Sequence, residues 1–597
     1  NLADDPLAAK RSELWRIYHA QPYGGEKRHR SKIVDQTSAE SVDWLLPELI
    51  RLFLASDEVC RYQAAGQEDE QQAKLETEAV NQMFLRGGTG YETLRTWLHD
   101  GLVSQNAYVK AYWHEETKTV RDTYRELTSD ELAGYHLREQ EEPGFSITSV
   151  VEHEERDAET NELLGSTFTV KCKIETKIKG FKVEPLPPDE VRITPRWNAI
   201  SLKGCPFVGH LKRTYDGQLI ADGYDPDQVA EIPEAGDDMS EERHNRFDYD
   251  GLSGGFGDLV AHAPGMRPVN VLEAFVLADW DGDGTAELIK TTLAGSDGQI
   301  LRWAPDRRGK VSSLKWPYDI EYADGDLPPI FGWSPWPQPH RHVGKSQVER
   351  AASVQRVNTE LWRAALDSIY FANNRRPIVN RNMADDDTIA DMNNQEPGRP
   401  IRVNGPPVEA IGSTQYEGVI QEAMALLEFN QGRAESITGV TRYNQGLDAD
   451  TLNKTATGLQ AIQTAGRGIQ EMIARNFADT GLKPLMLYLH TLLRKYGGGA
   501  QQLKIKGDWK QIDPAQWQPR TDMVVQVGLG AGSQAQKAND LAEVMAMQER
   551  VAPLGLADPA KIFAALDRWL AVKGYQNADE FFLDPTKQPP APPQPPM

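Results

Sequence analysis

Apolar residues in the first hundred positions recur at intervals of three and four, the spacing of one face of a helix. The stretch 40–55 shows this best, since its apolar residues share one face: Val42, Leu45, Leu46, Leu49, Ile50 and Phe53. Pro47 falls in the early turns of this predicted helix, where proline is tolerated. The same spacing predicts helices over 1–20, 72–86 and 91–100, whereas 103–113 is typical of a strand.

Beyond residue 145 the hydrophobic period changes to two. Apolar and polar residues alternate over 170–179, which predicts a strand with one solvated face. We expect 145–155 to be its hairpin partner, across a turn at 157–166. Short strands are expected around 191–193 and 207–211. The stretch 233–268 is rich in glycine and acidic residues, and it predicts an exposed insertion.

The second half of the chain is mainly helical. A long amphipathic stripe predicts a helix over 344–372, and a second helix is expected over 414–438. Prolines and glycines break the segment between them. A polar loop at 440–456 precedes a helix over 457–496, which Gly481 and Pro484 should kink and which 497–499 should end. Further strands (503–505 and 523–527), helices (534–552 and 558–574) and a proline-rich tail follow. The predicted class is therefore α+β, mainly helical.

Composition fits a globular protein of several regions. The 597 residues are 39% hydrophobic and 26% charged, and this length corresponds to about four domains. No stretch approaches the ~18 apolar residues of a membrane span, and no secretory signal is visible, so we expect no membrane association. Cys60, Cys172 and Cys205 have no metal or disulfide spacing, so we expect them in the core.

The charge of the chain excludes one class of function. With 65 basic and 88 acidic residues, the net charge is −23. A protein that holds DNA by net neutralisation of its phosphates needs the opposite sign. The acidic balance remains compatible with a protein that lets DNA pass without holding it.

The sharpest short motif is an acidic turn at 279–287. Carboxylates at alternate positions (Asp279, Asp281 and Asp283), with a glycine at the sixth position and Glu287 at the ninth, can surround a hard cation such as Ca²⁺. The twelfth position of an EF-hand would be glutamate, but here it is Lys290. The alternative, which we favour two to one, is a tight Asp-Gly hairpin between strands 271–277 and 286–292. We expect no cofactor other than this candidate Ca²⁺.

Two enzymatic readings have little support. Ser253 lies in a G-x-S-x-G pattern, but no apolar strand precedes it, as a hydrolase nucleophile would require. No phosphate-binding G-x-x-x-x-G-K-[ST] loop occurs, so we expect no ATPase activity and no catalytic residues. A serine or metal hydrolase and a calcium-binding structural module remain the alternative functions.

Positive charge is concentrated at two places in this acidic chain. One is the basic loop 27–32. The other is the proline- and glycine-broken segment after residue 374, and it contains five arginines: Arg375, Arg376, Arg381, Arg399 and Arg402. Basic runs of this kind are usually solvated faces, and Asp385, Asp386 and Asp387 offset the second group.

Three long segments carry a family resemblance. They are 185–233, with PPDEVRITPRWNAISLKGCPFVGH; 328–374, with PPIFGWSPWPQPHRHVGKSQVERAASVQRVNTELWRAALDSIYFANN; and 439–496, which begins GVTRYNQGLDADTLNKTATGLQ. Together with DWDGDGTAEL at 279–288 and VDWLLPELIRLF near the N-terminus, they resemble the portal proteins of tailed double-stranded-DNA bacteriophages, of the P22-like kind. The resemblance extends over 40–500. The insertion 233–268 and the tail after 575 lie outside it.

The resemblance implies a portal-type ring subunit with an α/β wing, a two-helix stem, a small α/β clip and a helical crown. Mapped in chain order, these regions are: wing, 1–343; first stem helix, 344–373; clip, 374–413; second stem helix, 414–439; tunnel loop, 440–456; kinked long wing helix and wing strands, 457–533; short crown, 534–585; and disordered proline-rich tail, 586–597.

The resemblance also implies a function and partners. A ring, usually of twelve copies, sits at one capsid vertex of the virion after assembly in the host cytoplasm. DNA is packaged and ejected through its channel. The clip arginines dock the large terminase subunit and then head–tail adaptor or tail proteins, and the ring also meets major capsid and scaffolding proteins. A mainly acidic wall repels the passing duplex, and tunnel-loop residues touch it weakly: Tyr443, Asn444, Gln445, Asp448, Thr451, Asn453 and Lys454.

Overall fold

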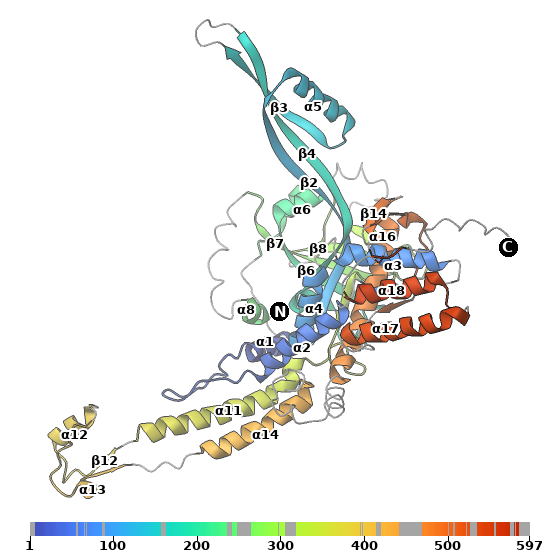
Figure 1. Cartoon of the computed structure of the whole chain (residues 1–597). Coiled ribbons are helices and arrows are strands. Elements are labelled where there is room, and N and C mark those ends of the chain that lie inside the picture. Colours follow the sequence, from blue (N-terminus) through green and yellow to red (C-terminus); the bar gives the residue numbers. More distant parts are fainter. Residues whose placement is uncertain are drawn as a thin grey trace.

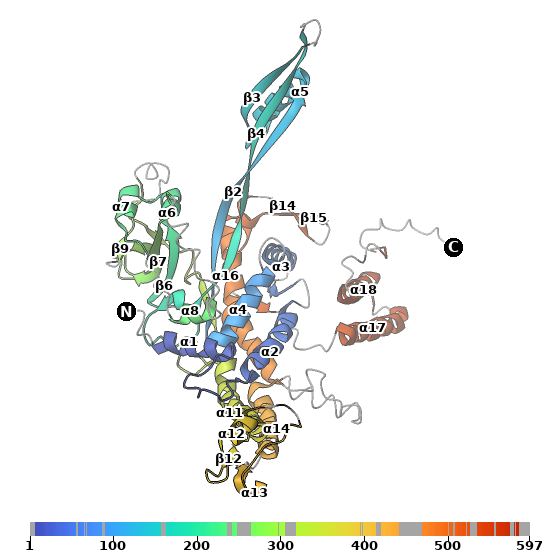
Figure 2. The same ribbon diagram turned by 90° about the vertical axis from the view of Figure 1, so that its left-hand side faces the viewer.

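The computed structural model of the chain combines helices and sheets, as the sequence predicts (Figure 1). It describes residues 6–54, 58–64, 66, 69–85, 90–156, 163–235, 241–247, 264–295, 298–304, 318–375, 377–394, 396, 398–413, 419–440, 468–499, 501–505, 508–520, 522–525, 534–554, 557–573, 578 and 581–583. A central body carries two projections, a long β-arm on one side and a helix pair on the other (Figures 1 and 2).

Four helices open the body: α1 (Pro6–Tyr18), α2 (Thr37–Phe53), α3 (Glu70–Leu85) and α4 (Gly90–Ser104). All four predicted helices are confirmed. The placement of Pro47 was wrong, because α2 begins at Thr37 and Pro47 therefore lies in its interior. The apolar face compensates for the missing backbone hydrogen bond, since Leu45, Leu46 and Leu49 are all buried.

The arm is a sheet of strand order β11-β2-β4-β3. Its strands are β2 (Ala107–Leu127), β3 (Phe145–Arg156), β4 (Leu163–Leu186) and β11 (Ile330–Trp333). The predicted hairpin of β3 with β4 is confirmed, since Phe145 pairs with Ile174. The expected strand 103–113 needs correction, because α4 runs to Ser104 and β2 continues to Leu127. The predicted turn was also too long, since β4 begins at Leu163.

Helix α5 (Ser129–Glu141) covers one face of the arm. A small core that includes Phe145, Val170 and Cys172 lies under it, separate from the core of the body. The threonine side chain at Thr128 caps the helix by accepting a hydrogen bond from the Glu131 amide. The arm therefore has its own hydrophobic support where it projects from the body.

A second sheet has the order β10-β8-β7-β6-β5, with β9 paired to β8. Its strands are β5 (Val191–Ile193), β6 (Phe207–Tyr215), β7 (Pro268–Ala278), β8 (Glu287–Ala294), β9 (Gln299–Ile300) and β10 (Ile320–Tyr322). Short helices α6 (Asp216–Asp222) and α7 (Pro226–Glu231) follow β6, and their apolar residues pack with β7 in a separate small core. The two short strands predicted here are confirmed.

The central core is built on aromatic side chains from distant parts of the chain. The Trp97 and Trp333 rings both meet the Phe477 ring edge-on, with ring centroids 4.8 and 5.0 Å apart. Helical structure over 468–496 supplies Phe477 and includes a π-turn at Ala478–Leu482, followed by α16 (Lys483–Tyr496). A Cβ on Gly481 would lie 3.0 Å from the Trp97 ring. The predicted irregularity at Gly481 is therefore confirmed, and it brings the helix against this cluster.

The remaining elements complete the body and its C-terminal part. Strand β1 (Cys60–Tyr62) pairs with β16 (Met523–Val525), and β14 (Gln501–Ile505) pairs with β15 (Asp508–Ile512), a strand not predicted. Helices α17 (Gln534–Val551) and α18 (Pro559–Lys573) pack on each other, as expected from the sequence. All three cysteines are buried. Across the described ranges, no helix combines the length and apolar character needed to cross a bilayer.

The helix pair consists of α11 (Gln347–Asn373) and α14 (Ile420–Thr438), which lie side by side and point away from the body (Figures 1 and 2). Both predicted helices are confirmed, although each begins a few residues later than expected. At the far end lie β12 (Pro377–Val379), α12 (Asp386–Asn393), α13 (Pro407–Ala410) and β13 (Ile411–Ser413). Strands β12 and β13 pair, so this distal segment is a small α/β unit.

The sequence predicts an exposed insertion at 233–268, but part of this stretch is buried. Helix α8 (Glu241–Phe247) within it packs against α1. Glu242 is fully buried there, with carboxylate oxygens 3.7 Å from an Arg11 guanidinium nitrogen and 3.9 Å from one of Arg246. Asn245 also donates a 2.7 Å hydrogen bond to the Ser12 hydroxyl. Polar contacts with α1 hold this helix in place, and an apolar pattern could not have revealed them.

The buried carboxyl group of Glu242 predicts a pH-dependent stability. Burial raises its pKa to about 7, although Arg11 and Arg246 act in the opposite direction. The folded state binds the proton of the Glu242 carboxyl more tightly than the unfolded state does, so protonation adds to the unfolding free energy. This gain is complete below the unfolded pKa and is lost as the pH rises through about 7. We expect Glu242→Gln to match the wild type at pH 4 and to exceed its unfolding free energy at pH 8 by up to about 3 kcal/mol. Denaturant titrations at both pH values measure the difference, and equal pH dependence in both proteins would contradict this expectation.

Candidate functional site

The base of the helix pair is fastened to the body by polar contacts. The Ser346 side chain caps α11 by accepting a 2.9 Å hydrogen bond from the Glu349 amide. Arg350 stacks on the Trp336 ring and donates hydrogen bonds of 2.9 and 3.2 Å to the Ile437 carbonyl oxygen, near the end of α14. A cation at the C-terminal end of α14 stabilises this helix, because its last carbonyl groups have no hydrogen-bond partners within the helix. The role of Arg350 is not predicted from the sequence.

Gly439 ends α14 in the left-handed conformation, with φ of 74°. A Cβ at this position would lie 2.7 Å from the Ile469 side chain, so only glycine fits without movement. The chain therefore turns sharply at the base of the pair. The predicted tunnel-loop residues come directly after this turn.

The basic loop 27–32 lies along α11. The Arg30 guanidinium lies 3.2 Å from the Asp367 carboxylate and 4.3 Å from the centre of the Phe371 ring. The Ser31 amide also donates a 2.8 Å hydrogen bond to Asp367. Nearby, Arg363 donates a 2.9 Å hydrogen bond to the Ile33 carbonyl oxygen. The loop thus supports one side of α11, so its charge is partly used within the chain.

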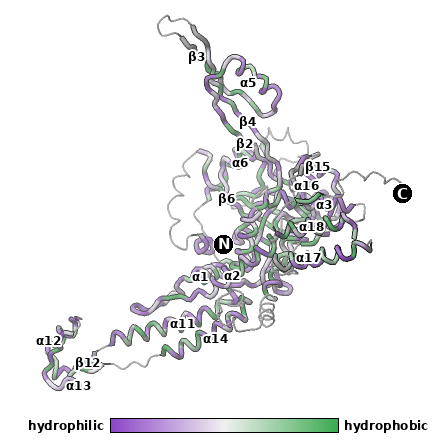
Figure 3. Tube along the Cα trace, in the orientation of Figure 1, coloured by the Kyte–Doolittle hydropathy of each residue, from purple (hydrophilic) through white to green (hydrophobic). Residues whose placement is uncertain are grey.

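Other parts of the helix pair expose large apolar side chains. Phe429 is 70% exposed on α14, where Met424 and Leu426 are each 51% exposed. On α11, Val357 is 49% and Tyr370 57% exposed. Figure 3 shows that hydrophobic and hydrophilic positions alternate along α11 and α14. Exposed apolar groups on one projecting element mark an association surface rather than a solvated face.

The structure places four of the five predicted docking arginines in the distal segment and at its entry. Arg402 makes a bidentate pair with Asp391, at 2.8 and 3.1 Å, and this holds the pKa of the Asp391 carboxyl at about 2. Arg399 lies 3.0 Å from Glu396. No ion pair within the described ranges engages the exposed Arg375 and Arg381 side chains. Arg376 lies outside the described residues. Two of the arginines are therefore free to meet a partner.

The acidic turn 279–287 is a hairpin between β7 and β8, as favoured by the sequence analysis. Its four carboxylates offer oxygens that all lie within 4.8 Å of one another. Asp279 accepts hydrogen bonds from the amides of Gly282 and Gly284, at 2.7 and 3.0 Å. Both glycines have positive φ, which explains their place in the motif. These hydrogen bonds account for the shape of the turn without a cation. Within the described ranges, the four carboxylates of the turn are the only group of potential metal ligands found.

Several predicted site residues fall outside the described residues. They are Ser253 and the tunnel-loop residues Tyr443, Asn444, Gln445, Asp448, Thr451, Asn453 and Lys454.

Comparison with protein-family models decides the family of the chain. The family model of the phage SU10 portal protein matches residues 1–597, the whole chain. The chain belongs to the phage SU10 portal protein family. A search of curated proteins found no match.

The match confirms the recognition of a phage portal protein from sequence. Portal proteins are structural rather than enzymatic. Membership implies a homo-oligomeric ring at the capsid vertex of the virion, with capsid and terminase partners.

Proposed function

We propose that copies of this chain form a ring whose central channel carries double-stranded DNA into and out of the capsid. The observation that supports it best is the exposed apolar surface of α11 and α14, especially Phe429, Met424 and Leu426. A neighbouring copy would cover this surface, and the free energy of burial, roughly 25 cal/mol per Å² of apolar area, would drive assembly. The interface would be heterologous, with α11 of one copy meeting α14 of the next, and such interfaces form a ring when the rotation between copies closes.

The helix pair would form the stem and the distal α/β segment the clip. The body and the β-arm would form the wing, and α17 and α18 the crown. We infer a ring of twelve copies, from the resemblance. With a net charge of −23 in every copy, the assembled wall would repel the duplex and keep it centred in the channel.

Arg375 and Arg381 would carry the docking of terminase and of the adaptor at the clip. Replacing both with glutamate is expected to weaken binding of the large terminase subunit at least about tenfold, since two cations become repulsive at the interface. Ring assembly should be unchanged, because the structure records no ion pair of these side chains within the described part of the chain. A pull-down of the terminase subunit by purified rings measures the effect. Lys212→Glu, an exposed change on β6, is the control, and equal binding by all three proteins would contradict the assignment.

The tunnel loop would contact the DNA backbone weakly through neutral polar side chains. Replacing Asn444, Gln445 and Asp448 together with alanine is expected to reduce DNA packaging while rings still form. Packaged DNA protected from nuclease, measured in an assembly extract, gives the result. Normal packaging by the triple variant would refute this role.

A further inference from the structure

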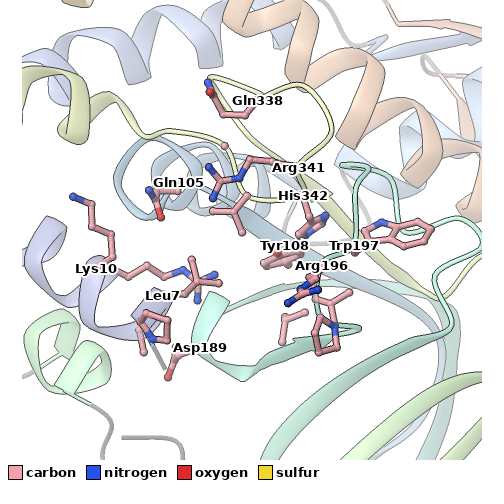
Figure 4. Close-up of a pocket in the computed structure, with 18 of the residues that line it drawn as sticks. Leu7, Lys10, Gln105, Tyr108, Asp189, Arg196, Trp197, Gln338, Arg341 and His342 are labelled. Carbon is pink, nitrogen blue, oxygen red and sulfur yellow. Dashed lines mark hydrogen bonds between the residues drawn. The ribbon is translucent and has the colours of Figure 1, made fainter. Parts of the chain in front are cut away.

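A cavity with a volume of about 920 Å³ lies where the body meets α11 (Figure 4). Its wall comes from α1, α8, the start of β2, the region around β5 and the loop 338–345. None of the predicted site residues lies in it. Six lysines and arginines but only three acidic residues line the cavity, in a chain whose net charge is −23.

Three cations of this cavity have exposed side chains and no partner in the described ranges. They are Arg196, Arg341 and Lys345, and no ion pair or side-chain hydrogen bond is recorded for any of them. Other cations of the body have acidic partners, as the Lys495–Asp324 pair illustrates. An unpaired cationic group beside a cavity favours an anionic ligand.

Buried polar atoms in the same wall also lack partners. Gln105 Oε1 and Asp189 Oδ1 accept no hydrogen bond from any described residue. These two atoms are acceptors, so they call for N–H or O–H donors from a ligand or from water. A phosphate group offers few N–H or O–H donors at neutral pH, whereas a peptide has a backbone N–H donor at nearly every residue.

The cavity wall is fixed before any ligand arrives. His342 is buried, and its Nδ1 lies 2.8 Å from the Ala199 carbonyl oxygen while its Nε2 lies 2.8 Å from the Tyr108 hydroxyl. The carbonyl can only accept, so Nδ1 carries the proton and Tyr108 donates to Nε2. Gln105, Arg196 and His340 also adopt φ values of 74°, 63° and 58°, which are uncommon for residues other than glycine. Such conformations cost free energy and gather at functional sites.

We propose that this cavity binds an acidic peptide segment of the neighbouring copy in the ring. The carboxylates of the segment meet Arg196, Arg341 and Lys345, while its backbone amides donate to the unpartnered acceptors of the wall. Charge complementarity identifies the occupant, because a second copy is an acidic chain that the ring always places alongside. The inference rests on the proposed ring.

Carbodiimide coupling tests the contact directly, because it joins a lysine amine to a carboxylate only when the two are paired. Rings are assembled from a mixture of ¹⁴N- and ¹⁵N-labelled chains, coupled, digested and analysed by mass spectrometry. We expect Lys345 to be joined to an aspartate or glutamate of the differently labelled chain. Lys203, exposed and outside the cavity, is the internal control, and Lys345→Arg should remove the product while rings persist.

Charge reversal gives an independent measure. Arg196→Glu combined with Arg341→Glu is expected to weaken ring assembly at least about tenfold, with Lys203→Glu close to wild type. Intact rings without a mixed-isotope product at Lys345 would overturn this inference and leave the ring itself standing. Protection of Lys345 from acetylation by added duplex DNA, with no coupling between chains, would also overturn it and assign the cavity to nucleic acid. Failure of the wild-type chain to form rings would overturn the proposed function first.

Discussion

Phe429→Asp is expected to prevent ring formation while the single chain keeps its fold. The side chain is 70% exposed, so the substitution removes little packing within the chain. In the ring, the phenyl group would be buried against a neighbouring copy, which is worth about 1.5–3 kcal/mol per interface. An aspartate there would also place an unpaired charge in an apolar contact, which costs further free energy. Because the change is repeated in every copy, assembly should fail at concentrations at which the wild type is fully assembled.

Two measurements separate a lost interface from a lost fold. Particle mass reports assembly, and circular dichroism with thermal unfolding reports the fold of the chain. Gln431→Asp is the matched control, since Gln431 is an exposed polar residue two positions further along α14. It introduces the same charge on the same helix and should assemble normally. Ring formation by Phe429→Asp would exclude this face of α14 from the interface.

Arg520→Ala is expected to destabilise the body by about 3–5 kcal/mol, the usual cost of breaking a buried ion pair. The Arg520 side chain is only 3% exposed, and it donates a 2.6 Å hydrogen bond to the fully buried Glu76 and a 2.9 Å hydrogen bond to Asp69. His490 contacts the same Glu76 carboxylate at 3.1 Å. Removing the guanidinium group would leave a buried carboxylate with too few partners.

The control for this prediction is Arg51→Ala, which breaks an exposed pair with Glu48 and should cost no more than about 1 kcal/mol. Burial raises the pKa of Glu76, but hydrogen bonds from His490 and Arg520 outweigh it, so the net pKa is below the ordinary value. The stability that this network provides is therefore present above the unfolded pKa of Glu76 and is lost as the pH falls below it. Denaturant titrations of Arg520→Ala and Arg51→Ala measure the loss of unfolding free energy in each. Equal losses would contradict the role of Arg520.

The sequence predicts most helices of the chain because their apolar stripes face a core. Helices α2 and α11 show this pattern, and each was expected within a few residues of its observed bounds; the end of α16 at Tyr496 was also expected, but its start was not. The distal half of β2 was missed for the opposite reason. Residues 114–127 lie on the arm, away from the main core, where both faces of the strand carry charged or hydroxyl side chains. No period of two marks such a strand, since little of it needs burial.

The polar contacts of the site could not be predicted from the sequence. Arg350 meets a carbonyl 87 positions further along the chain, and Arg520 meets a carboxylate 444 positions earlier. Only the folded chain brings such partners together, and neither arginine differs in local pattern from a solvated one. The exposed apolar residues of α14 are likewise part of an ordinary amphipathic pattern in the sequence. The structure is what shows that no other part of the described chain covers them.

The mass of the assembled particle tests the central claim most directly. Native mass spectrometry of the purified full-length chain should give one closed species at a fixed multiple of 66.7 kDa, and twelve copies are expected from the resemblance. A single species at 66.7 kDa at every concentration would contradict the account, since α11 and α14 would then expose their apolar residues without a neighbouring copy.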